Sequence, residues 1–178
     1  MRAACLSLAF LLAAPAQAEI VSQNANAFHV RHSVQVVVPP EQAYALLTTP
    51  SRWWDPEHSY SGDSANLLLD LRPGGCFCER LPDSGGFVEH LRLVQLKPGE
   101  ALVFTGGLGP LTFEAATGTM VWSVEKIAGG SRISLDYRAF GFPKGNGAAL
   151  AGPVDRVLGE QMKRLRRQAA AGNRRDIP

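Results

Sequence analysis

The segment from residue 53 to residue 79 carries the residues that decide the fold. It begins with WWDPEHSYSGD (53–63), continues with the strand-like run Leu67 to Leu71, and ends with GGCFCE (74–79). Two adjacent tryptophans beside a polar, proline-containing loop are typical of the mouth of a pocket. Each indole buries a large apolar area while its N–H group still finds a hydrogen-bond partner. The Gly-Gly pair indicates a turn into a second strand. The segment therefore predicts a β-rich fold with an aromatic-rimmed cavity. The alternative is that Trp53 and Trp54 form a hydrophobic plug between short helices and the sheet.

Seven stretches of the chain have the character of β-strands. Residues 28–36 alternate between apolar and polar side chains, which is the pattern of a strand with one buried face. The other six runs are separated by turn residues and cover 66–71, 76–81, 87–97, 101–106, 118–127 and 132–140. Loops rich in Gly and Pro between several of them predict antiparallel hairpins. Residues 19–26 read as a polar leader, and residues 106–117 as a loop over the cavity.

Three helical segments complete the pattern. Pro39-Pro40-Glu41 opens a helix, because proline fits a first helical turn and an acid favours its positive end. Residues 51–54 form a second short helix, and residues 152–168 repeat apolar side chains at helical spacing. The chain is therefore predicted to be α+β, with one curved antiparallel sheet of about seven strands wrapped around a long C-terminal helix, and two short helices after the first strand.

The order of these elements and four motifs resemble a known superfamily. The motifs are VVVPPEQAY (36–44), Trp53-Trp54, LRPGG (71–75) and LKPGEAL (96–102). They resemble the SRPBCC or START-like superfamily, whose helix-grip fold is shared with polyketide cyclases and heat-shock ATPase activator homologues. The resemblance covers residues 28–168 and implies an apolar cavity between sheet and helix. Across the superfamily such cavities serve lipids, hormones, polyketides or partner proteins. Residues 19–178 are thus expected to form a single START-like domain.

The first 18 residues have the pattern of a secretory signal. Arg2 provides the positive start, Ala3 to Ala14 the apolar stretch, and Ala16-Gln17-Ala18 the small-residue cleavage site. The chain is therefore predicted to be periplasmic or secreted after cleavage near Ala18, without a membrane span. Its 18 basic and 16 acidic residues nearly balance, and the basic C-terminus carries no nucleic-acid-binding motif. No nucleic-acid partner is expected, and any protein partner is left open.

After loss of Cys5 with the signal, only Cys76 and Cys78 remain. On an extended strand, Cα atoms two residues apart are separated by roughly 6.6–7 Å, at the limit for a disulfide. The pair is therefore predicted to stay as reduced, buried thiols, and a bridge would require a bulge. A thiolate nucleophile or a soft metal site beside His90 is a weaker alternative. No metal and no cofactor are predicted.

Alternation also sorts the side chains by face. The face predicted to point toward the core and cavity carries Phe28, Val30, His32, Val34 and Val36; Phe77 and Glu79; Phe87, Glu89, Leu91 and Leu93; Met120, Trp122 and Val124; and Ile133, Leu135 and Tyr137. The candidate pocket residues are Trp53, Trp54, His58, Glu79, Glu89, Trp122 and Tyr137. If the hairpin loop centres on Ser84, Glu79 lies opposite Glu89 and Cys78 opposite His90. Two facing carboxylates would raise the pKa of at least one of them and would suit acid–base chemistry. In the alternative, the register is offset and both acids reach solvent.

The sequence thus favours an exported protein that binds an apolar small molecule, such as a lipid, a polyketide or an aromatic compound. An apolar pocket with a few convergent polar groups is typical of a ligand site. The alternatives are a cyclase, dehydratase or hydrolase that uses Glu79, Glu89, His58 or Tyr137 for proton transfer, and a protein-interaction module. No catalytic triad order, phosphate loop or zinc-protease motif occurs in the sequence.

Overall fold

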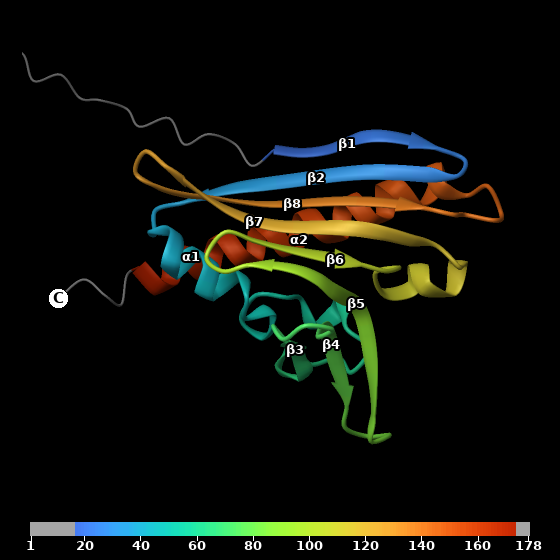
Figure 1. The fold of residues 1–178 in the computed structure, drawn as a ribbon, viewed down its shortest axis with the longest axis horizontal. Helices are drawn as coiled ribbons and strands as arrows, with labels where there is room; N and C mark the ends of the chain where they lie inside the picture. The colour runs from blue at the N-terminus through green and yellow to red at the C-terminus, as the bar shows by residue number, and fades with distance from the viewer. Residues whose placement is uncertain (1–16, 174–178) are drawn as a thin grey trace, which may run out of the picture.

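The computed structural model describes residues 17–173 as one antiparallel sheet of eight strands with a long C-terminal helix (Figure 1). The helices are α1 (Pro40–Leu47) and α2 (Gly147–Asn173), and the short 3-10 helices are η1 (Pro50–Arg52), η2 (Pro56–His58), η3 (Ser64–Asn66) and η4 (Gly109–Glu114). The strands are β1 (Gln17–Asn24), β2 (Ala27–Val36), β3 (Leu67–Leu69), β4 (Cys76–Leu81), β5 (Gly86–Lys97), β6 (Ala101–Thr105), β7 (Thr117–Ile127) and β8 (Gly130–Phe140). This architecture confirms the predicted α+β, helix-grip fold.

The strands lie in the order β1-β2-β8-β7-β6-β5-β4-β3. Figure 1 shows α2 running behind the sheet, while the β4–β5 hairpin bends away from the long strands. The helix packs mainly on β2 and β1, and the inner face of the sheet supplies the buried core. Buried and more exposed residues alternate strictly along β2 and β8, and along β7 as far as Val124, so the predicted faces of these strands are confirmed.

The long helix begins at Gly147, five residues before the predicted start at Gly152. Its first residue sits against the turn between β1 and β2, where the Gly147 N–H group donates to the Ala25 carbonyl at 2.9 Å. A Cβ atom at position 147 would lie only 2.8 Å from the Asn24 carbonyl oxygen. This tertiary contact fixes the residue at which the helix begins. The helical spacing of apolar residues in the sequence does not reveal that starting point.

Residues 19–26, predicted as a polar leader, instead belong largely to a strand. Strand β1 pairs antiparallel with β2, with Glu19 opposite Arg31 and Asn24 opposite Ala27. It lies at the edge of the sheet, where most of its side chains are exposed. Backbone hydrogen bonds hold an edge strand without a buried apolar face, so polarity was a misleading signal here. The predicted signal lies outside the described residues, except for Gln17 and Ala18, which begin β1.

The β4–β5 pairing contains a bulge that overturns the predicted register. Phe77 pairs with Leu91, but Cys78 pairs with Glu89, so His90 is an extra residue in β5. A bulge changes which side chains face inward along its strand. His90 and Leu91 are consecutive and both buried. Before the bulge, the predicted inward residues Phe87 and Glu89 point outward instead, and Phe87 is 74% exposed.

Cys76 and Cys78 form a disulfide, contrary to the prediction of two reduced thiols. Their Cα atoms are 5.4 Å apart, closer than an extended strand allows and within the usual disulfide range. The residue between them, Phe77, borders the point where the β4–β5 register shifts. The interrupted ladder thus permits a geometry that a regular strand would forbid.

We expect peptide mapping to find Cys76 and Cys78 joined. Protein denatured without reductant and treated with an alkylating reagent should carry no label on the tryptic peptide that contains both cysteines. After reduction, the same peptide should take up two labels. Labelling of both residues before reduction would show that the thiols are free.

Aromatic side chains fill the core beside the segment 53–63, the tryptophan loop. Trp122 is fully buried, and its ring centroid lies 5.6 Å from that of Trp53 and 5.1 Å from that of Phe104. Trp53 is 1% exposed and donates its Nε1–H to the Leu46 carbonyl at 3.0 Å. For Trp53, the structure therefore matches the hydrophobic-plug alternative, and Trp122 is part of the same core.

Replacing Trp122 with Ala should lower the free energy of unfolding by about 3–5 kcal/mol, because a large cavity remains in a packed core. Urea denaturation measures this change. The matched control is Phe87→Ala, whose exposed ring should contribute less than about 0.5 kcal/mol. Similar losses in the two variants would contradict the assigned core.

Candidate functional site

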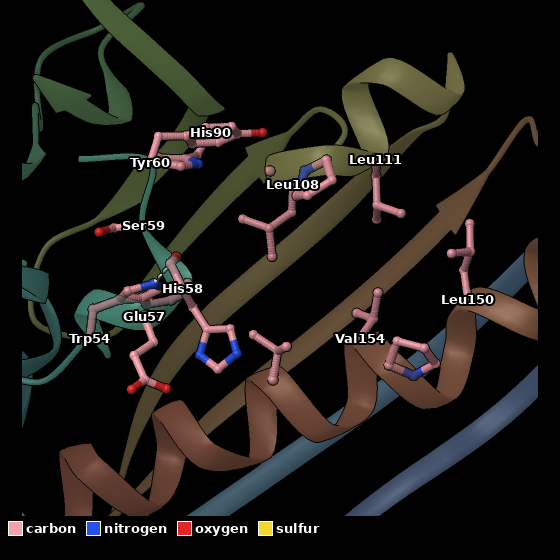
Figure 2. A pocket seen from close by; sticks show the side chains of 14 residues that line it. Trp54, Glu57, His58, Ser59, Tyr60, His90, Leu108, Leu111, Leu150 and Val154 are labelled. Carbon is pink, nitrogen blue, oxygen red and sulfur yellow. Dashed lines mark hydrogen bonds between the residues drawn. The ribbon is translucent and has the colours of Figure 1, made fainter. Parts of the chain in front are cut away.

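A cavity of about 360 Å³ opens between the tryptophan loop, the η4 segment and the first half of α2. Figure 2 shows its two characters: Glu57, His58, Tyr60 and His90 gather at one end, and aliphatic side chains surround the other. The lining comes from four places in the chain: Trp54, Glu57, His58, Ser59 and Tyr60; His90 of β5; Leu108, Gly109, Pro110 and Leu111; and Leu150, Pro153, Val154 and Val157.

The tryptophan loop is held by its own short-range hydrogen bonds. Trp54 is 4% exposed and donates its Nε1–H to the His58 carbonyl at 2.9 Å. Asp55 caps η2, its side chain accepting from the Glu57 N–H group at 3.2 Å. Pro56 fits the first position of this short helix. These contacts fix the backbone from which Glu57 and His58 reach the cavity.

Gln161 of α2 ties this loop to the long helix. Its side chain is fully buried, and its Oε1 accepts from the Asp55 N–H group at 2.7 Å. Its Nε2 lies 3.2 Å from Nδ1 of His58. A backbone N–H group can only donate, so Oε1 must face Asp55 and the amide NH₂ must face His58. His58 therefore accepts at Nδ1.

Glu79 has no exposed surface, yet its carboxylate is satisfied by three donors. The Tyr60 N–H group donates to Oε2 at 3.0 Å and the Ser61 N–H group to Oε1 at 2.6 Å. Nε2 of His90 lies 2.9 Å from Oε2. The carboxylate thus links β4, the bulge of β5 and the loop that follows η2.

These contacts set the charge states of the pair. Burial alone would raise the pKa of the Glu79 carboxyl, but the hydrogen bonds from Ser61, Tyr60 and His90 together hold it below its ordinary value. Burial lowers the pKa of His90, and the attraction of Glu79 only partly offsets this. The pair therefore consists of an ionised carboxylate and a neutral imidazole at pH 7.

Tyr137 holds residues 106–108, the segment that leads into η4 on the other side of the cavity. Its hydroxyl donates to the Gly106 carbonyl at 3.1 Å and accepts from the Leu108 N–H group at 3.0 Å. Burial raises the pKa of this phenol to about 12, so it stays protonated at neutral pH. Tyr137 thus positions Leu108, which lines the cavity, and is poorly suited to proton transfer.

The structure brings together only part of the predicted site. Trp54 and His58 line the cavity, and Glu79 lies behind its wall, where it holds His90. Trp53, Trp122 and Tyr137 are buried outside the lining. Glu89 lies on the outer face, where it pairs with Arg92. The expected Glu79–Glu89 pair does not exist, because the bulge places Val88 opposite Glu79.

Several cavity residues escaped the sequence prediction. His90 was considered only as a neighbour of Cys78, and the bulge that turns it inward leaves no local sequence signal. Leu108 and Leu111 come from the stretch predicted as a loop over the cavity, and they do line it. Val154 and Val157 were recognised as apolar positions of the helix. Only the three-dimensional structure separates helix residues that line a cavity from those that fill the core.

The polar end offers hydrogen bonding and proton transfer but little metal chemistry. In the described part of the chain, no three His, Cys, Asp or Glu side chains come together as metal ligands. A neutral imidazole oriented by a carboxylate is the arrangement of a general base. The same group also serves as a hydrogen-bond acceptor for a bound molecule.

Mild acid should destabilise the protein through His90 and His32, both of whose pKa values burial lowers. As the pH falls below about 6.5, the unfolded chain takes up protons before the folded one, so the free energy of unfolding falls. Each group contributes at most about 1.4 kcal/mol per pH unit. Glu79 acts in the same direction at lower pH, because its carboxyl has a lowered pKa and loses its hydrogen bonds on protonation.

Urea denaturation at pH 7.5 and pH 5.5 should therefore give the lower free energy of unfolding at pH 5.5. His90→Gln keeps a donor for Glu79 but removes the titrating group, so its loss between the two pH values should be smaller. His32→Gln should reduce the loss independently. Equal stability of the wild-type protein at both pH values would contradict the assignment.

The fold recurs in solved structures of low sequence identity. A protein of Mesorhizobium loti is 20% identical, with a TM-score of 0.55 over 84% of this chain and 99% of its own. A protein of Rhodobacter sphaeroides is 17% identical, with a TM-score of 0.55 over 87% and 99%. A Nitrosomonas europaea protein is 17% identical, with a TM-score of 0.54 over 85% and 97%. These likenesses show the fold alone.

No curated protein matches the sequence. A family model described as "Polyketide cyclase / dehydrase and lipid transport" matches residues 27–170, which span all the strands after β1 and nearly all of α2. This match confirms the resemblance that the motifs indicated. The chain belongs to the polyketide cyclase/dehydrase and lipid-transport family, of the SRPBCC type.

Proposed function

We propose that this protein binds an apolar small molecule in the cavity between the tryptophan loop, η4 and α2. The main support for this proposal is the apolar composition of the cavity wall. Leu108, Leu111, Leu150, Val154 and Val157 provide a continuous apolar surface around about 360 Å³. Burial of apolar ligand surface is worth roughly 25 cal/mol per Å². A cavity of this size accommodates a molecule of two or three fused or linked rings, or a folded acyl chain.

The family assignment supports the proposal, because the family is one of polyketide cyclases, dehydrases and lipid-transport proteins. Part of the aliphatic wall is not enclosed in the core. Val154 and Val157 are only partly buried, although both are apolar. A partly exposed apolar concavity on an otherwise polar helix surface is typical of a ligand site.

We also propose that the protein is exported and works as a single domain outside the cytoplasm. Two features support this, the signal-like pattern of residues 1–18 and the Cys76–Cys78 disulfide. Disulfides persist in oxidising compartments and are rare in the cytosol of most organisms. In the described residues no helix has both the length and the apolar character needed to cross a bilayer.

The binding proposal is tested by fluorescence titration with N-phenyl-1-naphthylamine, a neutral apolar probe. The wild-type protein should bind it with a rise in fluorescence. Val157→Asp places a charge in the apolar wall and should weaken binding at least about tenfold, because a buried carboxylate is costly to desolvate.

The matched control is Val37→Asp, the same substitution at a residue that is 68% exposed and outside the cavity. Val37→Asp should bind the probe like the wild type. Both variants should melt within a few degrees of it. Failure of the wild type to bind, or equal weakening by both substitutions, would contradict the proposed site.

A further inference from the structure

The two histidines at the polar end of the cavity have fixed hydrogen-bonding roles. For His90, the role is set by Glu79. The Glu79 carboxylate already accepts from two backbone N–H groups, and an ionised carboxylate can only accept. Nε2 of His90, 2.9 Å from Oε2, must therefore carry the hydrogen. In the neutral ring, the lone pair is then on Nδ1.

The ring of His90 is also fixed in orientation. It packs beside Phe77 and Tyr60, with centroid distances of 5.0 Å and 5.8 Å and interplanar angles of 32° and 31°. His90 is only 5% exposed and forms part of the cavity wall. Because the ring packs against two aromatic side chains and is tied at Nε2, it cannot flip without breaking the Glu79 contact. This buried polar group of the cavity wall is thus a hydrogen-bond acceptor.

His58 has the opposite role at the exposed rim. The amide of Gln161 donates to Nδ1 of His58, since its oxygen is occupied by the Asp55 N–H group. The neutral ring therefore carries its hydrogen on Nε2. Figure 2 shows His58 and His90 at the same end of the cavity. The lining of this end thus contains one hydrogen-bond acceptor and one donor.

We propose that this cavity selects neutral apolar molecules that bear a hydroxyl group, which donates to Nδ1 of His90, and that it disfavours carboxylates of the same shape. This inference rests on the proposed binding function. A hydroxyl carries the hydrogen that Nδ1 of His90 can accept. A carboxylate has only lone pairs and would face the lone pair of Nδ1. It would also lie near the negative charges of Glu79, behind the wall, and Glu57, in the lining.

Four naphthalenes of similar shape test the inference at pH 7.5: naphthalene, 2-naphthol, 2-methoxynaphthalene and 2-naphthoate. Dissociation constants are measured by displacement of N-phenyl-1-naphthylamine. The naphthol should bind about tenfold more tightly than the methoxy compound, because the ether leaves the buried Nδ1 without a donor. The naphthoate should bind more weakly than naphthalene. Equal affinities, or preference for the naphthoate, would overturn the inference.

The outcome also separates the inference from the function on which it rests. If naphthalene and its ether bind but the naphthol has no advantage, the apolar site stands and the hydroxyl selection is wrong. If the probe binds but none of the four displaces it, the hydroxyl selection is wrong; if the probe itself does not bind, both the selection and the binding function are wrong.

His90→Phe keeps the ring stacking but removes the acceptor, so it should abolish the advantage of the naphthol and leave naphthalene binding unchanged. His29→Phe, on the opposite sheet face beside Asp136, is the matched control and should preserve the advantage. His90→Phe removes the hydrogen-bond donor to the buried Glu79 carboxylate, which can unfold this variant. A second measurement therefore uses the wild-type protein.

Nitrogen-15 NMR of the wild-type imidazoles reports the tautomers directly. His90 should show a protonated Nε2 and an unprotonated Nδ1, and the Nδ1 resonance should move when 2-naphthol binds but not when 2-methoxynaphthalene binds. A protonated Nδ1 at pH 7.5, or an unchanged resonance with bound naphthol, would overturn the proposal.

Discussion

A carboxylate without exposed surface must have its charge compensated by neighbouring donors, and Glu79 is the group on which the geometry of the site depends. Its compensation comes from two backbone N–H groups at residues 60 and 61 and from His90. These donors belong to the loop after η2 and to β5, so one side chain joins three segments. Loss of the carboxylate would leave the loop and the histidine without their common partner. The side chains at the polar end of the cavity would then no longer be held in one arrangement.

The bulge at His90 makes this compensation possible. In a regular ladder, His90 would lie opposite Cys78 and point to the other face of the sheet from Leu91. The extra residue lets both point inward, so the imidazole reaches Glu79 while Leu91 still fills the core. The same irregularity lies beside the Cys76–Cys78 disulfide. Bulges next to binding sites commonly redirect one side chain in this way. Here the redirected residue, His90, is the most buried polar residue of the cavity lining.

The sequence predicted correctly which face a side chain lies on where this depends only on local alternation. The prediction was wrong where the face depends on how two strands pair. Strands β2 and β8 alternate regularly over their whole length, and β7 does so as far as Val124; their faces were predicted correctly. Phe87 and Glu89 were assigned to the wrong face because a one-residue insertion inverts the alternation beyond it. Edge strand β1 has backbone partners but little apolar burial, so its composition resembled a loop. Trp54 and His58 were found from loop composition, whereas Gln161 lies 103 residues from His58 and acts through a contact that no local pattern encodes.

Core and cavity share part of their residues, which has consequences for how the site tolerates change. Trp54, Leu108 and Leu111 line the cavity and also belong to the buried core. Val157 and Leu150 line the cavity as well but are partly exposed. Substitutions at these partly exposed positions remove fewer core contacts than substitutions at the buried ones, so this part of the apolar end can change at less cost in stability. The Glu79–His90 end lacks this freedom, because its polar atoms are buried and each needs its partner. The structure therefore joins a partly exposed apolar wall to a rigid polar end, and under the proposed function the polar end would determine which functional group of a ligand is recognised.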